Sequence, residues 1–219
     1  MIPIRDINPT RRFPVATVLI IVLNVIVFVF EFLLPYDALE AAVNTWGLVP
    51  DRLVSLEPLA FVTILTSMFL HSGPAHLLGN MLYLWIFGDN IEAAMGSLRF
   101  VLFYLLCGLG AALGQTLVSL RSIVPMVGAS GAISGILGSY LVLCPRAEVE
   151  TLVFLGYFVR FIRLPTVAVL GSWILVQLFS GVLSLGMHAT GGVAWFAHVG
   201  GFVAGILLIG LFRRPRWWE

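Results

Sequence analysis

The chain has 219 residues, of which 60% are hydrophobic and only 11% are charged, and its formal net charge is +1. A water-soluble domain carries roughly 25% charged residues, so this composition excludes a soluble globular domain and indicates an integral membrane protein. The small net charge leaves no basic surface for nucleic acid, and no nucleotide, metal or cofactor motif is present. We therefore expect membrane lipid as a partner, and no nucleic acid, nucleotide, metal or cofactor.

Six apolar segments, taken in chain order, are predicted to be membrane-spanning helices. They lie near residues 14–34, 75–91, 98–119, 130–144, 165–186 and 193–212. The first is predicted to be retained rather than cleaved as a signal peptide, because it is long enough to span and lacks an A-x-A-like cleavage site. These segments predict an all-α integral membrane protein, a six-transmembrane-helix bundle that forms one domain over residues 1–219.

Two further apolar runs are too short to span a membrane. The run 59–70 belongs to the connection 35–74, which we expect to be external and to lie partly in the outer membrane interface. The run 151–159 is followed by two arginines, which suits a segment that lies in the membrane interface.

The placement of arginine predicts the orientation of the chain. With the N-terminus inside, ten arginines fall in inner segments and only two, Arg52 and Arg121, in outer ones. The ten are Arg5, Arg11, Arg12, Arg99, Arg146, Arg160, Arg163, Arg213, Arg214 and Arg216. Because cytoplasmic loops of membrane proteins are enriched in basic residues, we expect both termini in the cytoplasm.

Polar side chains at several positions in the spans are functional candidates, because such groups are costly in lipid. The fourth segment is about 22 Å long at 1.5 Å per residue, too short for a core of about 30 Å. Ser130 is therefore expected below the outer surface, at about the depth of His198. His76 and Asn80 are four residues apart on one helical face, in the outer part of the second span. Polar groups from three helices should therefore meet at one depth.

Glycine spacing predicts that the fourth and sixth spans pack closely. Both contain glycines four residues apart, and small residues at this spacing let two helix backbones approach. They are Gly131, Gly135, Gly201 and Gly205. Such pairs usually serve packing alone, but these flank a serine and a histidine. Close packing would bring the Ser130 hydroxyl and the His198 imidazole within hydrogen-bond reach.

A serine and a histidine in contact can carry out acyl transfer. His198 would take the Ser130 proton as the hydroxyl attacks a carbonyl, and then return it to the leaving amine. The Ser130 amide at a helix N-terminus, His76 and Asn80 would donate to the oxyanion. Simpler interpretations remain open: a serine bonded to its own helix, an asparagine between helices, or a histidine acting as a relay, a ligand or an interhelical contact.

Three stretches resemble the rhomboid family of intramembrane serine proteases: HSGPAHLLGN (71–80), GASG (128–131) and AHVGGFVAG (197–205). Six spans and internal termini also resemble the family's minimal bacterial core. The resemblance implies a catalytic dyad of Ser130 and His198 without a third acidic member, and an oxyanion site built from His76, Asn80 and the Ser130 amide. The supporting residues that it implies are Gly128, Gly131, His71, Gly201 and Gly205.

The resemblance also implies a substrate class and a location. The protein would cleave transmembrane proteins in or near their spans, because a helical peptide bond is sheathed until the helix unwinds. It would lie in the cytoplasmic membrane of a bacterium, with the active site opening to the external or periplasmic side. Glu92 matches a family glutamate, for which helix capping or interhelical bonding is favoured over catalysis.

Two departures from the family pattern stand out. Trp46 is followed by Gly47, so the Trp-Arg pair of many relatives is missing from the first external connection. Ser134 replaces an aromatic residue that packs on the catalytic histidine in many relatives, which leaves open how the His198 ring is held. Two other classes of function remain as alternatives: an inactive rhomboid-like protein that binds membrane clients without cleaving them, and a metalloenzyme or transporter that uses the histidines.

Overall fold

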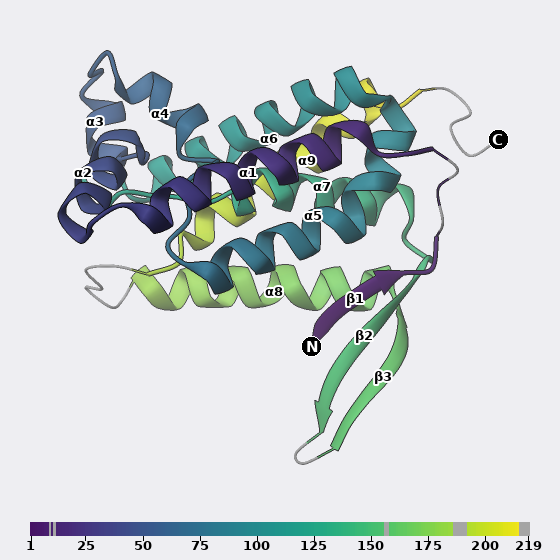
Figure 1. Ribbon diagram of the computed structural model, residues 1–219. Helices are drawn as coiled ribbons and strands as arrows, with labels where there is room; N and C mark the ends of the chain where they lie inside the picture. Colours follow the sequence, from purple (N-terminus) through teal and green to yellow (C-terminus); the bar gives the residue numbers. More distant parts are fainter. Residues whose placement is uncertain (9, 11, 156–157, 186–191, 215–219) are drawn as a thin grey trace.

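The architecture is a bundle of helices with a small sheet at one end (Figure 1). The computed structural model describes residues 1–219 except residues 9, 11, 156–157, 186–191 and 215–219. The helices are α1 Val15–Leu33, α2 Tyr36–Trp46, α3 Pro50–Val54, α4 Ala60–Thr66, α5 Pro74–Met95, α6 Ser97–Val118, α7 Ser130–Leu143, α8 Thr166–Leu185 and α9 Trp195–Phe212. The strands are β1 Ile2–Asp6, β2 Glu148–Leu155 and β3 Phe158–Pro165.

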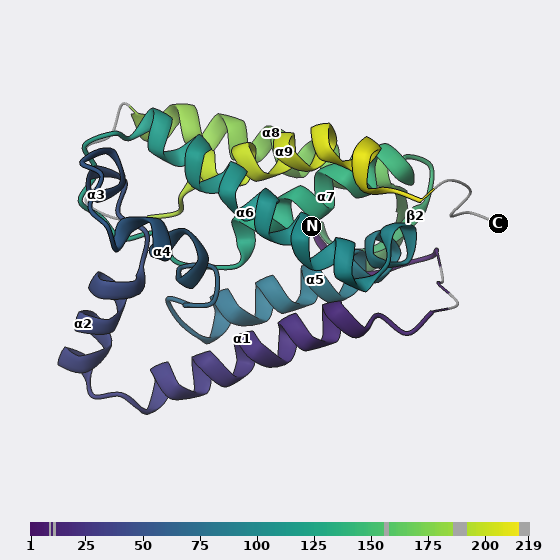
Figure 2. The same ribbon diagram turned by 90° about the horizontal axis from the view of Figure 1, so that it is seen from above.

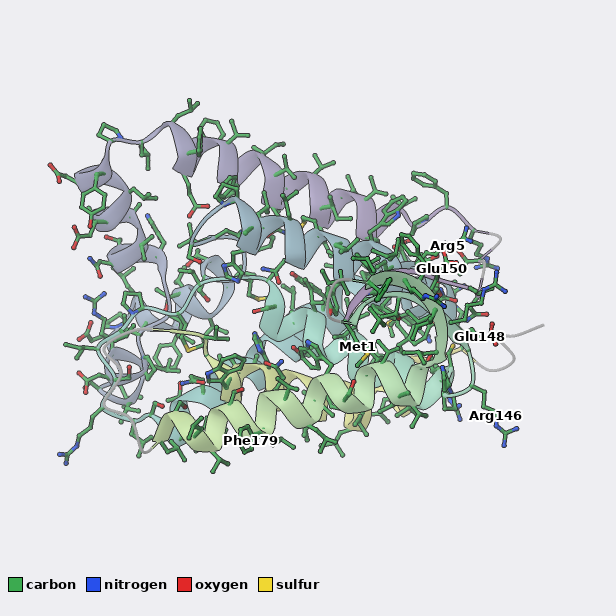
Figure 3. The ribbon with its side chains drawn as sticks, turned by 90° about the horizontal axis from the view of Figure 1, so that it is seen from below. Met1, Arg5, Arg146, Glu148, Glu150 and Phe179 are labelled. Carbon is green, nitrogen blue, oxygen red and sulfur yellow. The ribbon has the colours of Figure 1, made fainter. Side chains whose placement is uncertain are left out.

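Each predicted span overlaps one helix, α1, α5, α6, α7, α8 or α9 in chain order. Among the described residues, α1, α6, α8 and α9 are long and apolar enough to cross a membrane. α7 has only 14 residues, whereas α5 has 22 and continues beyond the predicted end of its span to Met95. Phe179 on α8 is 73% exposed and points away from the other helices (Figure 3), as expected of a lipid-facing side chain. These apolar helices make the chain an integral membrane protein.

Five positions used in the sequence predictions lie outside the described residues. They are Arg11 and Arg216, which entered the orientation argument; Gly156 and Tyr157, within the apolar run 151–159; and Gly186, the last residue of the predicted fifth span.

α7 lies inside the bundle, between α5 and α9 (Figure 2). Its residues from Gly131 to Tyr140 are all buried. A Cβ atom on Gly201 would overlap the carbonyl oxygen of Gly131, and one on Gly205 would overlap that of Gly135. The close approach of these two helices, predicted from the glycine spacing, is therefore confirmed, and it depends on backbone touching backbone.

The connection between α1 and α5 folds into the short helices α2, α3 and α4, at the end of the bundle opposite the sheet (Figure 1). It is tied to the segment that leads into α7. The Leu48 N–H donates to the Met126 carbonyl at 3.0 Å, and the Met126 N–H donates to the Leu48 carbonyl at 2.7 Å. This pairing helps to position the start of α7.

Glu92 on α5 holds the start of α1. Its carboxylate accepts hydrogen bonds from the N–H groups of Ala16 at 2.9 Å and Thr17 at 2.8 Å. The hydroxyls of Thr17 and Ser97 donate to it at 2.9 and 2.6 Å. Because Pro14 precedes α1 and offers no capping side chain, the carboxylate of another helix takes that role. The preference for capping over catalysis at Glu92 is confirmed.

Replacing Glu92 by leucine should strongly destabilise the fold. The change leaves the N–H groups of Ala16 and Thr17 and the Thr17 hydroxyl buried without an acceptor. Each such donor costs about 1–3 kcal/mol. We expect Glu92→Leu to lower the free energy of unfolding by about 3 kcal/mol or more, measured by denaturant titration in detergent micelles. Glu40→Leu, at an exposed position on α2, is the matched control and should change it little. Equal stability of the two variants would contradict the capping role.

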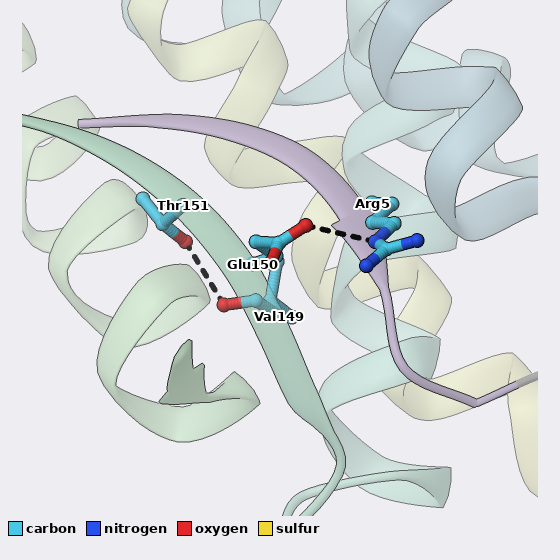
Figure 4. Close-up of polar contacts among 4 residues, drawn as sticks. All are labelled: Arg5, Val149, Glu150 and Thr151. Carbon is cyan, nitrogen blue, oxygen red and sulfur yellow. Dashed lines mark hydrogen bonds and ion pairs between the residues drawn. The ribbon is translucent and has the colours of Figure 1, made fainter. Parts of the chain in front are cut away.

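The prediction of an all-α fold is wrong, because the chain also forms a three-stranded antiparallel sheet in the order β1-β2-β3. In the segment expected in the membrane interface, residues 151–155 lie in β2 and residues 158–159 at the start of β3. β1 pairs with β2, although the two strands are far apart in the sequence. Arg5 Nε on β1 donates to Glu150 Oε2 on β2 at 2.8 Å (Figure 4). β-branched and aromatic residues favour the extended conformation, but the partner strand is too distant in sequence for periodicity to reveal it.

The N-terminal strand is also anchored to the helices. Asp6 Oδ2 accepts hydrogen bonds from the Tyr140 hydroxyl and from Asn90 Nδ2, both at 2.7 Å. The sheet therefore lies against the ends of α5 and α7 that are far from Ser130.

Candidate active site

Ser130 is the first residue of α7, and its position depends on Gly128. Gly128 has φ +126°, in the region that favours glycine, and its N–H donates to the Ser67 carbonyl at 2.8 Å. A Cβ atom there would lie 2.9 Å from His76 Nε2 and 3.6 Å from Ser130 Oγ. Glycine therefore allows both the turn and the approach of His76 to the serine.

His198 on α9 is held between two partners. Its Nε2 lies 2.8 Å from Ser130 Oγ, and its Nδ1 lies 2.7 Å from Gln177 Oε1. Because an amide oxygen only accepts hydrogen bonds, Nδ1 carries the proton of the neutral ring. Nε2 is then free to accept the proton of the serine hydroxyl. The contact expected from glycine packing is present, in the tautomer that a general base requires.

Gln177 was missed by the sequence analysis, although a signal for it existed. It lies in α8, which is apolar enough to cross a membrane, and it is only 6% exposed. The rule that singled out the other polar residues in the spans applies to this glutamine as well.

Aromatic rings from α8 and α9 flank the His198 ring. The ring centroid of Trp173 lies 5.9 Å from that of His198 at an interplanar angle of 37°, and Trp195 lies 6.4 Å away at 90°. The Ser134 hydroxyl instead donates to the Ser130 carbonyl at 2.6 Å, within its own helix. Residues of α8 and α9 therefore hold the ring where the aromatic residue of α7 is missing.

His76 presents a hydrogen-bond donor to the space beside Gly128. The Ser72 N–H donates to His76 Nδ1 at 3.3 Å, and Ser72 Oγ lies 3.0 Å from the same atom. Since Nδ1 accepts, the proton of the neutral ring lies on Nε2. That nitrogen borders the same space as Ser130 Oγ.

Asn80, one helical turn after His76 on α5, offers a second donor. Its side chain is 6% exposed, and its Nδ2 is buried without a hydrogen-bond partner in the part of the chain that the structure describes. A buried amide donor without a partner is costly, so a group that binds in the neighbouring space would relieve this cost.

His71 lies behind His76 rather than at the serine. The two rings make an edge contact with centroids 5.2 Å apart, and His71 Nδ1 lies 3.2 Å from the Phe69 carbonyl oxygen. The His71 N–H donates to the buried carboxylate of Glu31 on α1, at 3.1 and 3.2 Å to its two oxygens. This arrangement gives His71 a structural position next to the site.

A cavity of about 930 Å³ joins these groups. Ser130, His198, His76 and Asn80 all line it, together with Trp173 and Trp195. Among the described residues, no group of three or more His, Cys, Asp or Glu side chains is placed to hold a metal ion. The site thus combines an oriented serine and histidine with hydrogen-bond donors around one open space.

Comparison with known proteins identifies the family. Residues 58–215 match the family model of the rhomboid domain. The chain belongs to the rhomboid family. The resemblance predicted from the three sequence stretches is therefore confirmed, and the matched residues include every polar group described above at the cavity.

Several curated rhomboid proteins are similar to this chain. RHOMBOID-like protein 4 of Arabidopsis thaliana is 37% identical over 145 residues, which cover 66% of this chain and 32% of that protein. Rhomboid protease GluP of Bacillus subtilis is 31% identical over 156 residues, 70% of this chain and 26% of its own length. Rhomboid protein 1, mitochondrial, of Saccharomyces cerevisiae is 30% identical over 156 residues, which cover 67% of this chain and 40% of that protein. This rhomboid chain thus matches less than half of the length of each of these relatives.

Proposed function

We propose that this rhomboid-family protein is an intramembrane serine endopeptidase that cleaves transmembrane proteins in or near their spans. The observation that carries the proposal is the 2.8 Å contact between Ser130 Oγ and His198 Nε2 at the wall of the cavity. Membership of the family that includes Rhomboid protease GluP supports it. A serine bonded only to its own helix, the simpler interpretation, would not make this contact.

The proposed reaction has two halves. In the first, Ser130 Oγ forms a bond to the carbonyl carbon of the substrate, and its proton passes to His198 Nε2. The tetrahedral intermediate then expels the amine, which takes that proton, and an acyl-enzyme remains. In the second half, water gives a proton to His198 and attacks the ester. His198 finally returns the proton to Ser130, which releases the carboxyl product and restores the enzyme.

Three donors would stabilise the oxyanion in both halves. The Ser130 N–H is at the start of α7, where backbone N–H groups have no intrahelical acceptor and the helix dipole favours negative charge. Asn80 Nδ2 and His76 Nε2 provide two side-chain donors beside it. Preorganised donors of this kind favour the transition state over the ground state.

Loss of the Asn80 amide should slow the reaction without abolishing it. We expect Asn80→Ala to lower kcat by about 10²-fold, because the loss of one oxyanion donor has an effect of this size while the others remain. Asn24→Ala is the matched control: this asparagine is fully buried in α1, donates to the Ile20 carbonyl at 2.8 Å and does not line the cavity. Initial-rate kinetics on a model transmembrane substrate measure both. An equal effect on kcat would contradict the oxyanion role.

We further propose six spans, both termini in the cytoplasm and a cavity that opens to the external side. The start of α1 is bound by Glu92, and the Arg214 N–H just after α9 donates to the Ala94 carbonyl at 2.8 Å. The start of α1 and the end of α9 therefore lie at the same end of the bundle, which supports an even number of crossings. A bacterial cytoplasmic membrane is our proposed location, tested by protease protection of terminal tags in oriented vesicles.

The first test is labelling of the detergent-solubilised protein with a fluorescent fluorophosphonate, followed by cleavage of a model transmembrane substrate in liposomes. We expect both to proceed, and to proceed equally with a chelator present. Folded protein that neither labels nor cleaves would overturn the proposal and favour the client-binding alternative. Loss of cleavage in the chelator would favour the metalloenzyme alternative.

A further inference from the structure

We propose that Gln177 is a positioning residue that selects the tautomer of His198 and thereby connects α8 to the reacting pair. The inference rests on the proposed function, and it adds a member that the two-residue dyad does not contain. Its basis is a side chain from α8 that contacts the nitrogen of His198 opposite to the serine, at 2.7 Å.

The chemical argument starts from the two tautomers of a neutral imidazole. With the proton on Nδ1, Nε2 has a lone pair that can accept the serine proton. With the proton on Nε2, the same nitrogen can only donate to the serine, and the pair cannot begin the reaction. Gln177 Oε1 accepts from Nδ1–H and so favours the first state. Gln177 is only 6% exposed, so its acceptor oxygen occupies the place beside Nδ1 where water would otherwise leave both states populated.

The structural argument concerns where the ring finds its contacts. Ser130 is on α7, and Trp195 is on α9 with His198 itself. Gln177 and Trp173 are four residues apart on α8, hence on one helical face, and both contact the ring. α8 therefore supplies a hydrogen bond and an aromatic wall to a histidine on another helix. A reaction-competent His198 thus depends on the docking of α8 against α9.

Gln177→Leu tests the inference, because leucine keeps the bulk but removes the acceptor. We expect kcat to fall about tenfold, the effect of one lost hydrogen bond, while KM changes little because Gln177 acts through His198. Imidazole ¹⁵N chemical shifts of the histidine-labelled protein, assigned with His198→Ala, should show Nδ1–H in the wild type and a mixture of tautomers in the variant. If Gln177→Leu is not recovered folded, Gln177→Met provides the same test.

Two further variants separate positioning from a structural role. Gln115→Leu removes another glutamine, half-buried on α6, whose Oε1 accepts from the N–H groups of Phe196 and Ala197 at 3.1 and 3.2 Å at the start of α9. It should lower the melting temperature without changing the His198 tautomer. Gln177→Glu keeps an acceptor oxygen at the same reach and should restore Nδ1–H and most of the lost kcat.

Unchanged tautomers and kcat in Gln177→Leu would overturn the inference, as would an equal tautomer shift in Gln115→Leu. The tautomer is measured without any substrate, so this result is independent of the proposed function. A wild type that shows Nδ1–H but never labels or cleaves would mean that the protease proposal has failed. A wild type that cleaves, with a glutamine variant that cleaves equally well, would mean that only the inference has failed.

Discussion

Ser130→Ala and His198→Ala are each expected to lower kcat/KM by about 10⁴-fold or more, to the background of the assay. Removal of the nucleophile or of its base from such a pair costs this much, because the two groups act as one unit. For the same reason the double variant should be no slower than either single one. The measurement is cleavage of a transmembrane substrate in liposomes, together with the rate of fluorophosphonate labelling.

The control for this experiment is another serine of the same helix. Ser139 is fully buried in α7 and donates to the carbonyls of Gly135 and Gly205 at 2.9 and 3.1 Å, but it does not line the cavity. Ser139→Ala should retain kcat within a few-fold, so that loss of a buried hydroxyl is separated from loss of the nucleophile. Substantial turnover by folded Ser130→Ala would refute the serine protease mechanism.

Gly205→Ala is expected to have the second largest effect, on both stability and activity. A Cβ atom there would overlap the carbonyl oxygen of Gly135. The atoms it meets belong to the backbone of Gly135, which cannot rotate away as a side chain could. The helices α7 and α9 must then separate. Overpacking of this kind costs about 1–3 kcal/mol. The separation should also remove most of the activity, because Ser130 and His198 are on these two helices.

The matched control lies on the same helix. A Cβ atom on Gly210 would meet none of the described atoms within 4 Å. Gly210→Ala should therefore leave activity unchanged and stabilise α9 by up to about 1 kcal/mol, the difference in helix propensity between the two residues. Thermal unfolding in micelles and substrate cleavage measure both variants. Equal behaviour of Gly205→Ala and Gly210→Ala would contradict the role assigned to the contact between the two backbones.

Much of the helical core and of the candidate site was predictable from local patterns. A long apolar segment in lipid must form its backbone hydrogen bonds within itself, as a helix does. Each of the six predicted spans accordingly overlaps a helix. The spacing of Gly201 and Gly205 predicted the close approach to α7. Polar residues stand out against an apolar background because of their cost, and this singled out Ser130 and His198.

The features that were missed depend on partners distant in the chain. The strand Ile2–Asp6 is short, and only its pairing with β2 makes it a strand. An isolated pair of short strands has only marginal stability in water. The sheet therefore depends on its tertiary contacts, and no local sequence pattern predicts it. The N-terminus of α1 likewise has no capping residue of its own, and only Glu92 of α5 completes it.

By itself, the sequence determined that the protein lies in a membrane, that two of its helices touch through glycines, and which serine and histidine can meet. These properties follow from composition and spacing, because lipid penalises polar groups and only small residues allow backbones to touch. Only the tertiary structure decided which tautomer His198 adopts, how its ring is held without an aromatic at Ser134, and that β1 joins the sheet. Each of those depends on a contact with a segment that is distant in the sequence: a bond to one ring nitrogen, packing on one ring face, or pairing with one strand edge. Such contacts produce no periodic pattern in the sequence.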